Sequence, residues 1–132
     1  MIQRIQSLLF LLSSLISLSV VFYFPILSNA TGDLYLHDSD SLIYLRFLIF
    51  FSVFLSLFAI FQFQNRLRQR FISSLSRLMI TIFYIVILLF FREDNSLEIG
   101  VFLFIIPFVL LFLASFFIKK DDKLVRDSDR IR

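Results

Sequence analysis

The residues best suited to chemistry stand close together between the first two apolar segments. His37 is the chain's one histidine, and three carboxylates flank it, namely Asp33, Asp38 and Asp40. An imidazole with two or three carboxylates can bind a divalent cation, and the same groups could serve an enzyme acting outside a membrane. Carboxylates in a loop are more often simply solvated, and this is the interpretation that we adopt.

The rest of the sequence offers few groups for catalysis. There is no cysteine, which removes disulfides, thiolate metal ligands and cysteine nucleophiles. With only two glycines, the chain has no glycine-rich phosphate loop. No Asp, Glu or His stands inside the long apolar segments, so a carboxylate relay or a Ser–His dyad within the membrane has no residues to use. We therefore predict no catalytic residue, no cofactor, no metal ion and no enzymatic activity.

Arg46 is the strongest anomaly among the polar residues, because it stands about four residues inside the second apolar segment. At 1.5 Å per residue it would lie about 6 Å below the surface of a bilayer. Its guanidinium could reach back to the headgroups or pair with Asp38 or Asp40. It could instead face inward and bind a neighbouring helix or an anionic ligand.

Small residues form a stripe on the same segment. Ser52, Ser56 and Ala59 recur at i, i+4 and i+7, and Ser13 and Ser17 form a similar pair on the first segment. Small and hydroxyl-bearing residues let membrane helices approach closely and share hydrogen bonds. The alternative is that they line a polar pathway. Because these hydroxyls have no ionisable partner within the spans, we favour helix packing over a polar pathway.

The composition of the chain indicates what kind of structure must hold the polar residues named above, because it is unusually apolar. Of the 132 residues, 59% are hydrophobic and 17% are charged, and the mean hydropathy is +0.91. A soluble domain is roughly 45–50% apolar and about a quarter charged. Because a domain of about 150 residues still leaves roughly 30% of its unfolded surface in water, one small core cannot bury this surplus. We predict an integral membrane protein.

Four apolar segments can cross a bilayer as α-helices, which takes about 20 residues. The third must begin near Phe71, because the uncharged run from Leu78 is too short by itself, and Arg77 can then snorkel to the headgroups. The predicted spans are about residues 5–24, 42–61, 71–91 and 99–118, followed by a cytoplasmic tail over 119–132. We predict an all-α fold: one domain over residues 1–132, an integral membrane four-helix bundle of two antiparallel hairpins.

The basic residues indicate an orientation. Most of the 13 Lys and Arg residues lie near the N-terminus, between the second and third spans, or in the tail. Arg92 is the one basic residue in the loops at the opposite end. By the positive-inside rule, both termini are then cytoplasmic. Because basic groups in these places suit anionic lipid, we expect no nucleic-acid partner despite the net charge of +3.

The connection over residues 62–71 contains no glycine and no proline. We predict a short, tight turn at the level of the headgroups, with the reversal near Asn65. Arg66 and Arg70 recur on one face of it. A surface that docks a partner is the alternative interpretation.

Pro107 stands in the middle of the fourth span. It removes the backbone hydrogen bond to Leu103, so a kink is expected there, as a static bend rather than a moving hinge. The tail that follows mixes both signs of charge, and we predict that it is an anchored, solvated or frayed segment.

The first span must also be weighed as a signal peptide. The tripeptide Ser28-Asn29-Ala30 resembles a cleavage site between small residues, but the apolar stretch of about 20 residues exceeds the usual h-region of about 7–15. We predict an uncleaved span. Cleavage after Ala30 would instead leave three spans and an outside N-terminus.

Two short motifs carry a resemblance to a known family. They are the opening Met1-Ile2-Gln3-Arg4-Ile5-Gln6-Ser7-Leu8 and the basic turn Asn65-Arg66-Leu67-Arg68-Gln69. With its length and four spans, the chain resembles the small bacterial membrane proteins, typified in the Bacteroidetes, of domain of unknown function four-two-nine-three. The resemblance implies a bacterial inner (cytoplasmic) membrane and a retained N-terminus, and it brings no reaction, ligand or catalytic residue.

We expect a non-enzymatic accessory subunit or assembly factor of a membrane complex. The alternative is a small oligomeric channel or transporter for a small solute, including an anionic one. The expected partners are the lipid bilayer and either another membrane protein or further copies of this chain. The candidate intramembrane or partner contacts are Arg46, Ser52, Ser56, Arg66 and Arg70.

Overall fold

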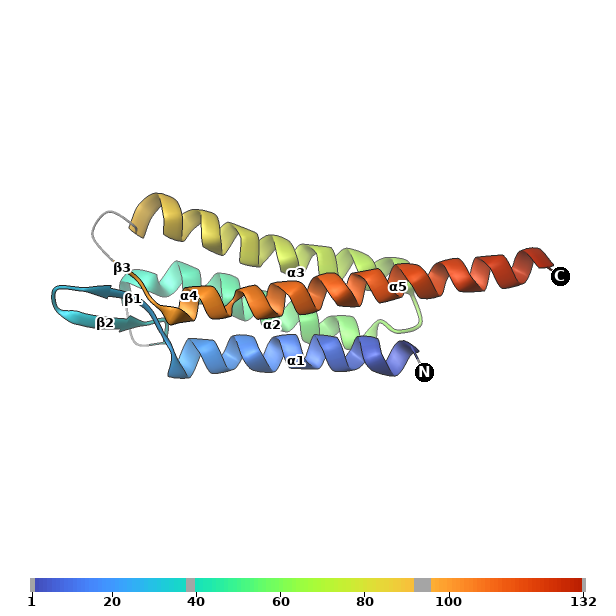
Figure 1. The fold of residues 1–132 in the computed structure, drawn as a ribbon, viewed down its shortest axis with the longest axis horizontal. Helices are drawn as coiled ribbons and strands as arrows, with labels where there is room; N and C mark the ends of the chain where they lie inside the picture. Colours follow the sequence, from blue (N-terminus) through green and yellow to red (C-terminus); the bar gives the residue numbers. More distant parts are fainter. Residues whose placement is uncertain (1, 38–39, 92–95, 132) are drawn as a thin grey trace.

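The computed structural model describes residues 2–37, 40–91 and 96–131. Four long helices lie side by side, with both chain ends at one end of the bundle and a small sheet at the other (Figure 1). The helices are α1 (Ile2–Tyr23), α2 (Ile43–Phe61), α3 (Arg66–Val86) and α5 (Ile105–Ile131). Shorter helical elements are η1 (Asp40–Leu42), the π-helical turn η2 (Ile87–Phe91) that continues α3, and α4 (Ile99–Leu103). All four long elements are long and apolar enough to cross a membrane.

Each long helix packs against two others, in the order α1, α2, α3, α5 and back to α1. This is the arrangement of two antiparallel hairpins placed side by side, as the sequence predicts. We call the end that carries the chain termini the terminal end and the opposite one the sheet end (Figure 1).

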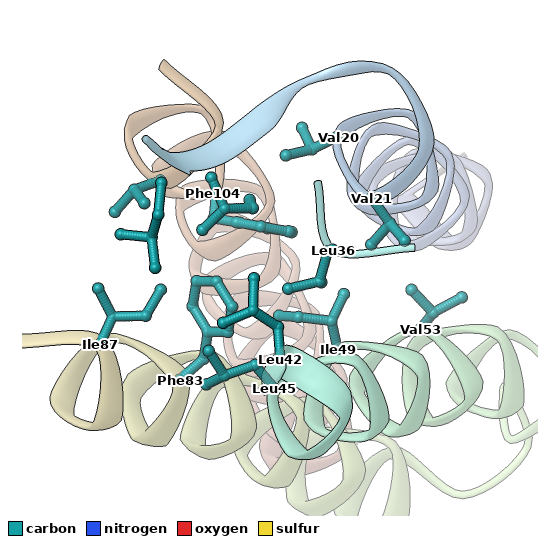
Figure 2. Packing of buried hydrophobic residues seen from close by; sticks show 13 residues of the cluster. Val20, Val21, Leu36, Leu42, Leu45, Ile49, Val53, Phe83, Ile87 and Phe104 are labelled. Atoms are coloured by element: carbon teal, nitrogen blue, oxygen red, sulfur yellow. The ribbon is translucent and has the colours of Figure 1, made fainter. Parts of the chain in front are cut away.

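The core consists of two clusters. The one nearer the sheet combines Val20 and Val21 of α1 with residues of α2, α3 and the α4–α5 junction. In Figure 2, Leu45, Phe83 and Phe104 converge from these different elements. The rings of Phe83 and Phe104 meet edge to face, with centroids 4.8 Å apart. The second cluster lies toward the terminal end and comprises Phe10, Ala59, Ile80, Leu111, Ala114 and Ile118.

The sheet at the sheet end corrects the prediction of an all-α fold. Strands β1 (Pro25–Asn29), β2 (Gly32–Tyr35) and β3 (Ser96–Leu97) pair antiparallel in the order β2-β1-β3. The first two form a hairpin, and the third joins it from the loop between α3 and α4. A loop that lies against an apolar core must satisfy its backbone N–H and C=O groups, and strand pairing does so. Ile26 and Leu27 of β1 are fully buried under this cover.

Gly100 decides how closely α4 approaches the sheet. A Cβ atom at this position would overlap the backbone carbonyl of Pro25. The amide of Glu98 donates to the carbonyl of Ile26 over 3.0 Å, just before α4 begins. Only a residue without a side chain therefore fits where α4 meets β1.

The helix bounds differ from the predicted spans mainly at the terminal end. Helix α3 begins at Arg66 rather than near Phe71, because the side chain of Asn65 caps it by accepting a hydrogen bond from the Arg68 amide over 3.3 Å. Residues 66–71, predicted as part of a turn, are helical. Helix α5 runs through to Ile131, so the predicted tail continues the helix.

The fourth span, for which the sequence predicts a kink at Pro107, is divided into two helices just before this proline. Helix α4 ends at Leu103 and α5 begins at Ile105, so the break falls at Phe104, three residues before Pro107. Proline has no N–H for the Leu103 carbonyl, so regular helical bonding is interrupted there. The π-helical turn over Ile87–Phe91 was not predicted.

Candidate interaction surfaces

Arg46 lies in the first turn of α2, at the sheet end. Its Nε donates to the backbone carbonyl of Leu36 over 2.7 Å. Leu36 follows β2 and is fully buried. The half-buried arginine therefore ties the β-hairpin to α2 through a backbone oxygen, which is a structural use for its guanidinium group.

Ser52 and Ser56 are both buried, but they bond differently. The Ser52 Oγ lies 2.8 Å from the Ser76 Oγ of α3. The Ser56 hydroxyl donates to the Val53 carbonyl of its own helix over 2.8 Å. The predicted stripe therefore faces the interior, and of its two serines only Ser52 bonds to another helix within the described chain.

Hydroxyl contacts join further helix pairs. Ser73 of α3 lies 2.8 Å from Ser115 of α5, Oγ to Oγ, and it also donates to the Leu111 carbonyl over 3.2 Å. Ser13 of α1 donates to the carbonyl of Pro107 over 3.4 Å. Polar side chains thus link α3 to α5 and α1 to α5.

Sequence reasoning missed the polar stripe on α3. Gln69, Ser73 and Ser76 are buried there at spacings of four and three residues. The Nε2 of Gln69 donates to the Ala59 carbonyl of α2 over 3.1 Å. The spacing was visible in the sequence, but the prediction of a turn over residues 62–71 placed Gln69 outside the helix.

Arg66 and Arg70 serve different surfaces. The Arg66 Nε lies 3.3 Å from the Asp121 Oδ2, so this ion pair joins the start of α3 to the part of α5 that leaves the bundle. Arg70 lines a groove between α3 and α5 together with Leu67, Phe71, Ser74, Arg77 and Ser115. One arginine is therefore part of a helix contact, whereas the other faces a space of about 360 Å³.

His37 lies among aromatic rings at the sheet end. Its ring centroid is 5.9 Å from that of Phe22 and 5.7 Å from that of Tyr35. Asp38, named with it as a candidate ligand, lies outside the described residues. Within the described ranges no group of three His, Cys, Asp or Glu side chains could hold a metal ion.

The architecture and the comparisons together define what kind of protein this is. The molecule is a helical bundle with four helices that are long and apolar enough to span a membrane. The chain belongs to the family described as Domain of unknown function (DUF4293), whose model matches residues 2–131. The resemblance carried by the N-terminal run and the α2–α3 turn is thereby confirmed. No curated protein and no solved structure matches the chain.

Proposed function

We propose that this chain is a non-enzymatic accessory subunit or assembly factor of a membrane complex. In this proposal it crosses a bacterial cytoplasmic membrane four times, with both termini inside, and binds its partner at the terminal end. The positive-inside rule supports this orientation, because Arg66, Arg68 and Arg70 at the start of α3 and the basic residues at the end of α5 lie there.

The observation that carries the proposal is the extension of α5. This helix continues well past the other three and projects from the terminal end (Figure 1). Every residue from Lys123 to Arg130 is exposed. An isolated helix shorter than about 12–15 residues is marginal in water, so an extension that packs against so little protein gains stability when a partner covers it.

The extension also carries groups suited to a protein contact. Leu124 is 51% exposed and Val125 is 39% exposed, between charged residues of both signs. A small apolar centre with a polar rim is the usual composition of a protein–protein contact. The Arg66–Asp121 ion pair joins the base of the extension to the start of α3.

The alternative role as a channel or transporter has weaker support. Two of the four serine candidates for a pathway, Ser13 and Ser52, bind groups on neighbouring helices. Ser56 binds a carbonyl of its own helix, and Ser17 is the fourth candidate. Arg46, the candidate for attracting anions, binds a backbone carbonyl at the sheet end. These contacts favour a role in packing for Ser13, Ser52 and Arg46.

The test is capture of the tagged full-length protein at native expression in mild detergents, followed by mass spectrometry of the intact complexes. We expect a stoichiometric partner that is lost from the Leu124→Gln/Val125→Gln variant. The matched control, Asp129→Asn/Arg130→Gln, changes two polar residues on the same extension and should retain the partner. A protein that purifies alone and monodisperse in several mild detergents would overturn the proposal. A homo-oligomer without other partners would move the channel hypothesis ahead.

A further inference from the structure

The groove between α3 and α5 concentrates positive charge beside apolar surface. Its α3 wall presents Arg70, Ser74 and Arg77, which recur at i, i+4 and i+7 and so share one face of the helix. Ser115 of α5 completes the polar lining. We call these four residues and the adjoining Leu67 and Phe71 the α3–α5 groove.

The two arginines of this groove have no anionic partner among the described residues. Within the part of the chain that the structure describes, neither guanidinium forms an ion pair. The guanidinium carbon of Arg77 instead lies 5.5 Å from the centre of the Phe112 ring on α5. This contact holds Arg77 against α5, so the groove contains two positive charges and no compensating carboxylate.

Placing these charges at or below the edge of the apolar layer of a membrane is unfavourable unless an anion pairs with them. A span of about 20 residues counted back from Phe91 ends near Ile72, so Arg77 lies about 8 Å inside the apolar layer and Arg70 lies just outside it. Arginine at such depth persists where it snorkels or pairs. Because side chains of a helix lean toward its N-terminus, the stem of Arg77 leads back toward Ser74 and Arg70.

We propose that the α3–α5 groove binds the phosphate of an acidic phospholipid of the inner leaflet. Arg70 and Arg77 would contact the phosphate oxygens, with the Ser74 and Ser115 hydroxyls within the same groove. Guanidinium groups suit phosphate because several N–H donors can bind its oxygens together. Basic pockets between membrane helices on the cytoplasmic side are the usual form of such sites.

Apolar surface favours a lipid over free phosphate as the occupant. Leu67 is 65% exposed and Phe71 is 70% exposed, and both line the groove beside the arginines. They provide an apolar wall for the glycerol portion of a lipid, which inorganic phosphate lacks. A lipid also arrives from the bilayer that already surrounds α3 and α5.

The test is native mass spectrometry of the full-length protein in detergent, with dioleoyl-phosphatidylglycerol and dioleoyl-phosphatidylcholine added at equal concentration. The wild-type protein should retain the acidic lipid about 25-fold more strongly, which corresponds to about fivefold for each arginine. Arg70→Gln/Arg77→Gln should abolish this preference, whereas Arg70→Lys/Arg77→Lys should keep part of it. The matched control is Arg68→Gln/Arg130→Gln, which removes the same charge from exposed sites outside the groove.

Three results would overturn the proposal. The first is equal retention of the two lipids by the wild-type protein, a measurement that needs no folded variant. The second is an equal loss of preference in the groove variant and the control, because net charge would then explain it. The third is displacement of the acidic lipid by a large excess of inorganic phosphate, which would identify free phosphate as the ligand.

Discussion

Ser52 of α2 and Ser76 of α3 bind each other reciprocally in the interior of the bundle. Their Oγ atoms lie 2.8 Å apart, and each hydroxyl also reaches the backbone carbonyl of the other residue, over 3.2 Å from Ser52 and 3.0 Å from Ser76. Both side chains are almost fully buried. The pair therefore satisfies two polar groups and, through the small size of serine, lets the two helices approach closely.

Ser52→Leu should destabilise the bundle, because a larger side chain must fit at this close approach. Overpacking of this kind typically costs about 1–3 kcal/mol. Ser76→Ala should cost less, about 0.6 kcal/mol for each hydrogen bond lost between membrane helices. Thermal unfolding in detergent measures both changes. Ser19→Ala serves as the control, since the exposed Ser19 hydroxyl donates to the Leu15 carbonyl of its own helix. Equal melting of Ser52→Leu and wild type would contradict the close packing.

Gly100→Ala should loosen the contact between α4 and β1. The added methyl group would overlap the carbonyl of Pro25 and press on the buried side chain of Ile26. We expect a loss of about 1–3 kcal/mol, typical of an overpacked site. Ile99→Ala is the matched control, because Ile99 is the exposed neighbour in the same helix and surface changes usually stay within about 0.5 kcal/mol. Comparison of the two melting temperatures checks the prediction, and a larger effect at Ile99 would argue against it.

Asp121→Asn should release the start of the α5 extension without unfolding the bundle. A partly exposed ion pair such as Arg66–Asp121 contributes only about 0–1 kcal/mol to global stability. Hydrogen exchange of the amides after Lys119 should nevertheless rise about two- to fivefold, as loss of up to 1 kcal/mol predicts locally.

The charge-swapped pair Arg66→Asp/Asp121→Arg should restore protection of these amides. Asp122→Asn is a control, because Asp122 pairs within α5 with Arg126. Unchanged exchange in Asp121→Asn would mean that the extension is held by other contacts.

Cysteines at Ser28 and Ser96 should form a disulfide between the two loops of the sheet end. These residues are paired across β1 and β3, and their Oγ atoms lie 2.6 Å apart. The chain has no cysteine of its own, so a new bond can be assigned without ambiguity. Mass spectrometry and maleimide labelling after oxidation measure the yield.

The control pair is Asp33→Cys/Ser96→Cys. Asp33 pairs with Ser28 from the other side of β1, so it lies about 10 Å from Ser96, beyond the reach of a disulfide. Bond formation inside cells without added oxidant would further place the sheet end in an oxidising compartment. Similar yields from both cysteine pairs would contradict the strand order.

The helical part of the fold followed from local sequence. A helix satisfies its own backbone hydrogen bonds, so a long apolar run predicts one without knowledge of its neighbours. Pro25 ended the first span as expected, since α1 stops at Tyr23. The interruption before Pro107 was predictable for the same reason, because the missing N–H is a property of the residue itself.

Other features depended on residues far apart in the chain. Residues Ser96–Leu97 are too few to suggest a strand, and they become one because β1 lies beside them. The groove needs α3 and α5 to be neighbours, since Arg77 meets Phe112 only across that interface. Likewise, the sequence predicted that Ser52 belongs to a stripe of small residues, but it did not identify Ser76 as the partner of its hydroxyl.

The sequence by itself therefore determined the composition, the four apolar helices and the concentration of basic residues at one end. Only the tertiary structure decided the sheet, the partner of each buried hydroxyl and the different environments of Arg66 and Arg70. The physical reason is that helix formation and membrane compatibility depend on adjacent residues, whereas strand pairing and contacts between helices depend on which distant segments meet.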